Sequence, residues 1–325
     1  MAPQNQTLCD ALRGISGILI TPFDSTDEIN PYLLQPVIDR AVRAGVHLLV
    51  ANGNTSEFYA LDAHESERMV HATVELVAGR VPLLSGVGKN IKDACHLARV
   101  SSTAGASGLM VHQPPDPFVA PRGVLDYVRR IAEASDGLPM VLYLRDDGIG
   151  LDVIEMLARL PGVVGIKWAC PTPLRLGTMI DRTRDKNLAW VGGLAESWAP
   201  AFYAVGSRGF TSGLINVMPS HSVAIHTALQ NANYQEATRL INVMAEFEEL
   251  RTEERNGTNV TVVKTALQLI GNDCGHVRPH WRLAANKHRT GQTCSRLATH
   301  KFLMARTRVQ NKSNFEITGC KVDRI

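Results

Sequence analysis

Short apolar runs alternate with amphipathic segments along most of the chain. Eight of these runs are rich in Val, Ile and Leu and end at glycine, proline or polar residues, as strands buried on both faces do. The segments between them repeat apolar residues with a helical period, and Pro31 and Gly45 mark the first one as a helix start and stop. The predicted strands cover residues 18–23, 47–51, 81–85, 108–112, 140–144, 163–168, 188–191 and 209–217.

Strands that alternate with helices form parallel βαβ units, which are spaced here by roughly 20–30 residues. Eight such units predict an α/β fold, the (β/α)8 TIM barrel, with an open doubly wound sheet as the alternative. In a barrel the chemistry lies at the carboxyl ends of the strands and in the loops that follow them. The candidate site residues at those ends are Thr21, Asn54, Thr55, Gln113, Tyr143, Arg145, Lys167, Gly192, Gly193, Thr211 and Ser212.

After residue 217 the pattern becomes purely helical. Helices are predicted over residues 221–230, 234–255 and 260–270, and Gly271 closes the last of them. Residues 276–325 show neither a helical nor a strand period. We therefore predict a barrel over residues 1–217, a helical appendix over 218–275 and an irregular basic tail over 276–325.

Charge separates this tail from the rest of the chain. Residues 276–325 contain 11 Lys/Arg and two Asp/Glu, a net charge of +9, which leaves −6 for residues 1–275. A basic tail is compatible with nucleic acid or an acidic partner, but a charge imbalance specifies no contact geometry. We favour a poorly ordered end without nucleic-acid binding. The abrupt change in pattern also suits an appended segment or a change of reading frame.

The composition is that of an ordinary globular enzyme or binding protein, with 45% hydrophobic and 20% charged residues. The first nine residues lack the apolar core of a secretory signal, and no run of about 18 apolar residues predicts a membrane span. The six cysteines are scattered and form no CxxC pair, which indicates reduced thiols and a cytoplasmic protein.

Lys167 is the anomaly among the strand residues, because it lies in the apolar run Val163–Trp168. Lysine is almost never fully buried without a partner, and burial lowers its pKa by disfavouring the ammonium form. A neutral amine in a dry pocket can attack a carbonyl carbon and form a Schiff base. The alternative is a strand-end lysine whose amine reaches water.

Two further features lie at neighbouring strand ends. Tyr143 ends the predicted strand before that of Lys167, and a tyrosine hydroxyl there could relay protons for a lysine-bound imine. Gly53-Asn54-Thr55-Ser56 follows the second strand, where small residues and free backbone N–H groups can hold a carboxylate, although an ordinary turn explains them too. Histidines and cysteines do not have metal-ligand spacing, so no metal site is expected.

Taken together and in this order, these residues resemble one enzyme superfamily. Gly-x-Thr-x-Glu at 53–57, Tyr143 on the fifth strand and Gly165-Ile166-Lys167 on the sixth are similar to the dihydrodipicolinate synthase/N-acetylneuraminate lyase superfamily. The resemblance extends from about residue 14 to about residue 279. It implies a (β/α)8 barrel with C-terminal helices, usually a homotetramer, that binds a 2-oxo acid as a lysine Schiff base without metal or organic cofactor. It implies Lys167 as nucleophile, Tyr143 as proton shuttle and Thr55 as part of the carboxylate holder.

The chain departs from the synthase at several positions. Asn54 stands where the synthase usually has a second threonine, and Gly148 stands where it has an arginine for the aldehyde substrate. The relay tyrosine that a neighbouring synthase subunit supplies has no counterpart within residues 112–117. Tyr143-Leu144-Arg145-Asp146 is more similar to the 5-dehydro-4-deoxyglucarate dehydratase branch, although Trp168-Ala169 follows the lysine where that branch usually has Asp-Gly.

Three hypotheses follow from the resemblance. The first is a Schiff-base lyase, either an aldolase or a dehydratase of a 2-oxo-3-deoxy sugar acid, that works as a homotetramer or homodimer. The second is 4-hydroxy-tetrahydrodipicolinate synthase, which joins pyruvate to aspartate semialdehyde. The third is a non-catalytic barrel that binds a 2-oxo acid. In the first, Lys167 and Tyr143 are catalytic, and the substrate is bound by Thr55, Asn54, Ser56, Arg145, Gly193 and Thr211.

Overall fold

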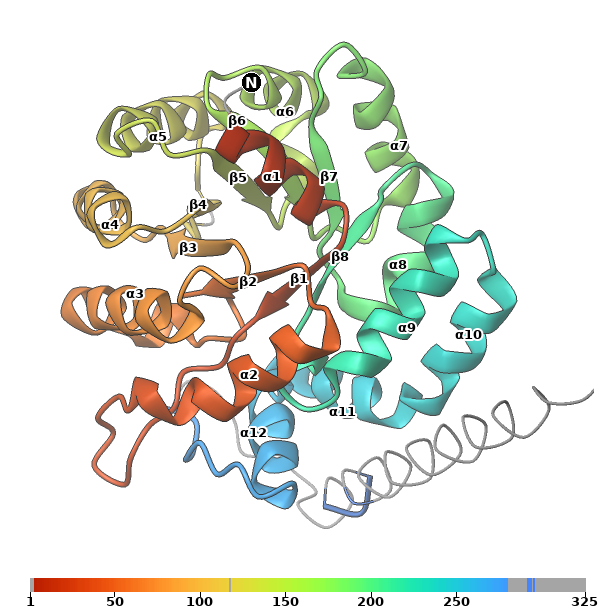
Figure 1. Ribbon diagram of the computed structural model, residues 1–325. Helices are drawn as coiled ribbons and strands as arrows, with labels where there is room; N and C mark the ends of the chain where they lie inside the picture. Colours follow the sequence, from red (N-terminus) through yellow and green to blue (C-terminus); the bar gives the residue numbers. More distant parts are fainter. Residues whose placement is uncertain (1–2, 117, 280–290, 294, 296–325) are drawn as a thin grey trace, which may run out of the picture.

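A closed barrel of eight parallel strands forms the centre of the molecule (Figure 1). The computed structural model describes residues 3–116, 118–279, 291–293 and 295. Each strand pairs with its neighbours in sequence, and β8 pairs back to β1, so the predicted (β/α)8 barrel is confirmed and the open sheet is excluded. The strands are β1 (Ile15–Ile18), β2 (Leu48–Ala51), β3 (Leu83–Val87), β4 (Gly108–His112), β5 (Met140–Leu144), β6 (Val163–Trp168), β7 (Ala189–Gly192) and β8 (Gly209–Ser212).

Seven helices among the described residues surround the barrel, and each follows one of the strands β1 to β7 along the chain. They are α2 (Gln35–Ala44), α3 (Ala63–Val77), α4 (Ile91–Ala104), α5 (Pro121–Ala134), α6 (Leu151–Ala158), α7 (Pro173–Arg182) and α8 (Ala195–Ala204). Local signals explain their limits. A reciprocal capping box of Asp62 and Glu65 starts α3, and Gly45 and Gly105 adopt the left-handed conformation that ends α2 and α4.

Every residue of the eight strands is buried, because alternate side chains point into the barrel and out toward the helices. Leu48, Val50, Met110 and Val141 belong to one apolar cluster that fills the interior. Side chains on the other face pack against the helices in two larger clusters. The barrel is therefore a packed core, and open space begins only above the carboxyl ends of its strands.

An N-terminal helix that the sequence analysis did not predict packs at the opposite end. Helix α1 (Pro3–Leu12) contacts β1, β6 and β7, and Figure 1 shows it lying across the barrel end. Its Leu8, Cys9 and Leu12 are buried in the same cluster as the interior strand residues. The sequence analysis missed this helix because most of its other residues are polar, and its buried apolar residues span little more than one helical turn.

The predicted first strand lies too far along the chain, and the predicted last strand is too long. The first strand ends at Ile18 rather than continuing to Phe23, and the last ends at Ser212 before the short 3-10 helix Leu214–Asn216. Asn216 explains both ends, because its amide donates to the Ile18 and Gly213 carbonyls (both 2.8 Å) and accepts from the Ile20 N–H (3.2 Å). These side-chain bonds satisfy backbone groups that a longer ladder would otherwise pair.

The predicted helical appendix is confirmed, although one of its helices is divided. The segment 234–255 forms α10 (Tyr234–Val243) and α11 (Ala245–Asn256), which are separated at Met244. They follow α9 (Pro219–Gln230) and precede α12 (Asn259–Leu269). Helix α9 packs against α2 and α8, while α11 and α12 pack against each other. None of the described helices is both long and apolar enough to cross a membrane.

A buried ion pair fastens the last helix to the barrel. The Lys264 ammonium on α12 lies 2.8 Å from the carboxylate of Glu57, and both side chains are almost completely buried. The same carboxylate accepts the Arg278 N–H (3.0 Å), and the Arg278 guanidinium pairs with Glu65 at the start of α3. The segment 276–279, which charge and the lack of a period assigned to the tail, therefore packs against the barrel.

The rest of the predicted tail, residues 280–325 apart from 291–293 and 295, lies outside the described residues. The division of the chain into three parts stays a prediction.

Candidate active site

A cavity of about 710 Å³ opens at the carboxyl ends of the strands. Eight residues were predicted to be catalytic or to bind substrate, and seven of them line this cavity: Asn54, Thr55, Tyr143, Arg145, Lys167, Gly193 and Thr211. They come from β5, β6 and β8 and from the loops after β2, β5 and β7. The closed barrel brings these positions to one mouth although they are spread over more than 150 residues of sequence.

Lys167 lies in the floor of this cavity and is 4% exposed. Its strand register places it directly opposite Tyr143 on β5, and its Nζ lies 3.8 Å from the centroid of the Tyr143 ring. Burial, and secondarily the nearby positive charge of Arg145, lowers the pKa of Lys167 to about 7. The amine therefore loses its proton near neutral pH, where a fully exposed lysine keeps it, and the neutral form is the nucleophile.

Tyr143 forms one wall beside the lysine. The same desolvation raises the pKa of its hydroxyl to about 12, although the charge of Arg145 opposes this shift. The phenol therefore carries its proton at neutral pH and can donate it. Its ring also packs edge-to-face on the buried His112 ring, with the centroids 5.1 Å apart, which fixes its orientation.

The loop after β2 presents Asn54 and Thr55 to the cavity but not Ser56. The Ser56 hydroxyl accepts the Gly53 N–H (2.9 Å) and donates to the Leu19 carbonyl (2.5 Å). The Thr21 hydroxyl also bonds the Ser56 carbonyl (2.6 Å). The Ser56 side chain therefore holds the loop against the end of β1 and does not line the cavity, and its role in substrate binding stays a prediction.

Packing explains Gly193 and Trp168, which both lie near Lys167. A Cβ on Gly193 would lie 2.7 Å from the Ala169 Cβ and 2.8 Å from the Trp168 carbonyl oxygen, so only glycine lets β7 approach β6 here. The Trp168 side chain is fully buried between the outer face of the strands and the helices, where its ring lies edge-on to that of Trp190. The unusual residue after the lysine thus belongs to the core rather than to the cavity.

Gly148, which stands where the synthase has an arginine, lies in a short 3-10 turn away from the cavity. Its N–H donates to the Asp146 carboxylate (2.8 Å). Arg145, two residues after Tyr143, lines the cavity instead, and its backbone N–H is held by the side chain of Gln113 (2.8 Å).

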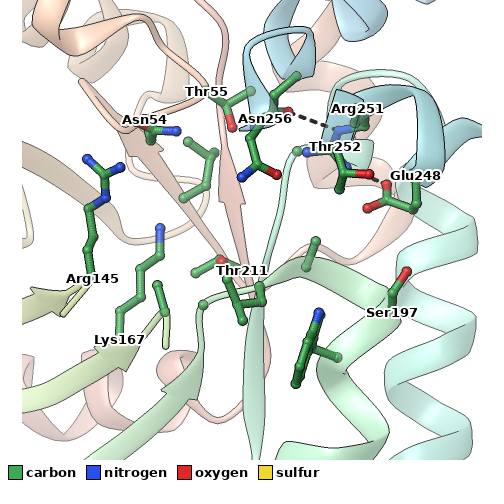
Figure 2. A pocket seen from close by; sticks show the side chains of 18 of the residues that line it. Asn54, Thr55, Arg145, Lys167, Ser197, Thr211, Glu248, Arg251, Thr252 and Asn256 are labelled. Atoms are coloured by element: carbon green, nitrogen blue, oxygen red, sulfur yellow. Dashed lines mark hydrogen bonds and ion pairs between the residues drawn. The ribbon is translucent and has the colours of Figure 1, made fainter. Parts of the chain in front are cut away.

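The opposite wall comes from the C-terminal helices, and the sequence analysis missed it. Figure 2 shows Arg251, Glu248, Thr252 and Asn256 across the cavity from Lys167. The Arg251 guanidinium pairs with Glu248 and donates to Asn259 (3.0 Å), and both members of the pair are buried. No local pattern distinguishes the charge-rich stretch 246–255 from a solvated helix face, and only its position over the barrel mouth places it at the cavity.

A buried carboxyl group lies behind β8. Glu196 accepts hydrogen bonds from Ser212 (2.5 Å) and Ser222 (2.6 Å) and is fully buried. Burial, and then the negative charge of Glu248, raises the pKa of Glu196 to about 7. Among the described residues, no group of three His, Cys, Asp or Glu side chains is arranged to hold a metal ion.

Comparison with known proteins identifies relatives of two activities. The family model described as "Dihydrodipicolinate synthetase family" matches residues 11–295. A protein named 4-hydroxy-tetrahydrodipicolinate synthase from Methanoculleus marisnigri is 32% identical over 272 residues, 82% of this chain and 91% of its own length. A probable 5-dehydro-4-deoxyglucarate dehydratase 1 from Streptomyces coelicolor is also 32% identical, over 260 residues, 77% of this chain and 81% of its own.

A solved structure is similar along nearly its whole length. The crystal structure of dihydrodipicolinate synthase from Bacillus clausii has a TM-score of 0.85 and 36% sequence identity, and the match covers 90% of this chain and 99% of that one.

The lowered pKa of Lys167 predicts a stability that depends on pH. The pKa of an unfolded lysine is about 10.4, so between about pH 7 and pH 10 the unfolded chain binds more protons at this residue, and stability must rise with pH. Lys167→Met removes this effect. We expect the variant to be more stable than the wild type at pH 7, by on the order of 2 kcal/mol, with the difference shrinking toward pH 10.

Urea unfolding of both proteins at several pH values measures this difference. Lys186→Met, which alters an exposed lysine, is the matched control and should show no such trend. A Lys167→Met difference that stays constant between pH 7 and pH 10 would show that the amine is charged in the folded protein.

Proposed function

The chain belongs to the dihydrodipicolinate synthetase family, and on that premise we propose that it is a lyase that forms a Schiff base between Lys167 and a 2-oxo acid. The proposed substrates are 2-oxo-3-deoxy sugar acids, from which the enzyme removes an aldehyde or water. Enzymatic action of this general class follows from family membership, and the lysine intermediate and the substrate are the proposal.

The observation that carries the proposal is the environment of the Lys167 amine. It lies in the floor of a cavity large enough for a six-carbon acid, beside a protonated tyrosine, with a pKa of about 7. A strand-end lysine that reaches bulk water would have neither the burial nor the lowered pKa. These are the conditions under which an amine attacks a ketone at neutral pH.

The first chemical step joins Lys167 to C2 of the substrate. The neutral amine attacks the carbonyl carbon, a proton moves from nitrogen to oxygen, and a second proton lets the oxygen leave as water. We assign the supply of that proton to Tyr143, since its hydroxyl is protonated at neutral pH. The product is an iminium ion, whose positive charge lies near the face of the Tyr143 ring.

The iminium then accepts an electron pair from the substrate. In an aldolase, the C4 hydroxyl loses its proton, the C3–C4 bond breaks, and an enamine and an aldehyde form. The enamine then takes up a proton at C3 and becomes an imine. In a dehydratase, C3 loses a proton to give the enamine, and the C4 hydroxyl then takes up a proton and leaves as water. In both cases water hydrolyses the remaining imine and returns the free amine of Lys167.

Charge in the cavity suits an anionic and hydroxylated substrate. Asn54 and Thr55 offer an amide and a hydroxyl for the carboxylate next to the ketone, and Arg145 offers a guanidinium further out. Thr252 and Asn256 lie across the cavity, where hydroxyl groups of a longer chain would reach them. Pyruvate, with three carbons, would leave most of this volume unused.

The second candidate function is 4-hydroxy-tetrahydrodipicolinate synthase. It is favoured by the relative and the solved structure that carry synthase names, at 32% and 36% identity. Against it stand Gly148, which has no side chain to hold the aldehyde substrate, and the place of Arg145 in the cavity. A homo-oligomer and a non-catalytic binding barrel also remain hypotheses.

Trapping with borohydride tests the intermediate. We expect incubation with pyruvate and sodium borohydride to add one reduced pyruvate to the peptide that contains Lys167, because borohydride reduces an imine to a stable amine. The rate of trapping should rise with pH through about 7, as the amine loses its proton. Mass spectrometry of the digested protein measures both.

Lys186→Met should be trapped like the wild type, and Lys167→Met should not be. Modification of some other lysine, or of none, would contradict the proposal and would favour a barrel that binds its ligand without covalent chemistry.

Turnover assays separate the two catalytic candidates. We expect 2-oxo-3-deoxy acids of five or six carbons to be consumed with a kcat/KM at least about 100-fold above that for condensation of pyruvate with aspartate semialdehyde. The physical reason is that the groups placed far from Lys167 can bind only a longer chain. Release of pyruvate plus an aldehyde identifies an aldolase, while loss of water identifies a dehydratase. Efficient condensation with aspartate semialdehyde would instead establish the synthase.

A further inference from the structure

A chain of polar side chains runs behind Arg145, outside the groups assigned to the reaction. His112, at the end of β4, is buried, and its Nε2 lies 3.0 Å from the Asn52 carbonyl oxygen. Its Nδ1 lies 3.3 Å from the hydroxyl of Tyr59, in the loop after β2. The Tyr59 hydroxyl also lies close to Arg145. Burial raises the pKa of Tyr59, and the positive charge of Arg145 opposes this rise.

The direction of each hydrogen bond follows from which of the nitrogen and oxygen atoms carry a proton. A carbonyl oxygen can only accept, so His112 Nε2 must carry a proton. Burial lowers the pKa of His112 to about 3, so the ring is neutral and Nδ1 has no proton. Nδ1 is therefore the acceptor, and the Tyr59 O–H donates to it. The lone pairs of the Tyr59 oxygen are then left for the Arg145 guanidinium, which can only donate.

Packing holds this chain in place. The His112 ring stacks on Phe58, with the centroids 4.6 Å apart, and contacts the Tyr59 ring edge-to-face at 5.6 Å. Arg145 is different, because it is an exposed residue at the end of β5. A long exposed side chain samples many rotamers and loses conformational entropy when it is fixed. A rigid acceptor beside it reduces the number of orientations before the substrate arrives.

We propose that Tyr59, held by His112, is a positioning residue that orients the Arg145 guanidinium toward the substrate group farthest from the reacting ketone. Figure 2 shows the Arg145 guanidinium on the same side of the cavity as Lys167 and Asn54. The chain sets specificity for an acid that carries a second carboxylate or a hydroxyl at its distal end. This inference rests on the proposed function, because it requires that Arg145 contacts a bound substrate.

The inference predicts an effect of Tyr59→Phe on long substrates but not on pyruvate. Loss of the hydroxyl should raise KM for a 2-oxo-3-deoxy acid about tenfold and change kcat by less than about threefold, since binding of the distal group is the interaction that is weakened. The pyruvate concentration that gives half-maximal trapping should stay within about twofold, because pyruvate has no distal group. In an Arg145→Met background, Tyr59→Phe should have almost no further effect on KM.

Tyr127→Phe is the matched control. It removes another partly buried tyrosine hydroxyl, which donates to the Lys89 carbonyl (3.1 Å) away from the cavity, and should leave both constants unchanged. A Tyr59→Phe effect of the same size with and without Arg145, or an equal effect on pyruvate, would overturn the inference.

A cycle of melting temperatures in the absence of ligand separates this inference from the proposed function. Tyr59→Phe, Arg145→Met and the double variant should shift the melting temperature by less together than the sum of the two single shifts, because both single changes remove the same contact. Such coupling without trapping of pyruvate would mean that the hydrogen-bonded chain exists and the Schiff-base function fails. Trapping with strictly additive shifts would leave the function intact and overturn the role of Tyr59.

Discussion

In the barrel mouth the Lys167 ammonium would lose most of its hydration shell and gain the face of the Tyr143 ring, 3.8 Å from Nζ, in return. That exchange is unfavourable for the charged form, and the nearby Arg145 adds to it, so the pKa of Lys167 falls to about 7. The geometry of the site follows from this constraint. The lysine has to stand on a strand to be held in the dry interior, and it has to stand at the end of that strand to be reached.

The C-terminal part of the chain completes what the barrel begins. Helix α11 covers one side of the mouth and supplies Arg251 and Glu248, while α12 is tied to the loop after β2 through the buried pair of Lys264 and Glu57. That loop also carries Asn54 and Thr55. Separating a buried ion pair leaves an unpaired charge in the interior, which destabilises a fold by several kcal/mol. The loop, the last helix and the segment at Arg278 are therefore fixed relative to one another.

The barrel and the residues at its mouth could be predicted from the sequence because they depend on local patterns. The short apolar run Val163–Trp168 predicts a buried strand, and the order of eight strands then brings Tyr143, Lys167 and Thr55 together. Other features depend on contacts that no local pattern contains. Ser56 has the same chemistry as Thr55, but its hydroxyl is used by Gly53 and Leu19. Arg251 belongs to a helix with a charged face, and only the path of the chain after β8 turns that face toward the cavity.

The central claim is that burial lowers the pKa of the Lys167 amine to about 7. Nuclear magnetic resonance of protein labelled with 13C and 15N at lysine measures its titration directly, and the resonance is assigned by its loss in Lys167→Met. The account predicts that the Lys167 resonance titrates near pH 7, while exposed lysines titrate near 10.4. A Lys167 resonance that titrates at pH 10 or above would show that the amine is solvated and charged, and the proposed chemistry would then lack its nucleophile.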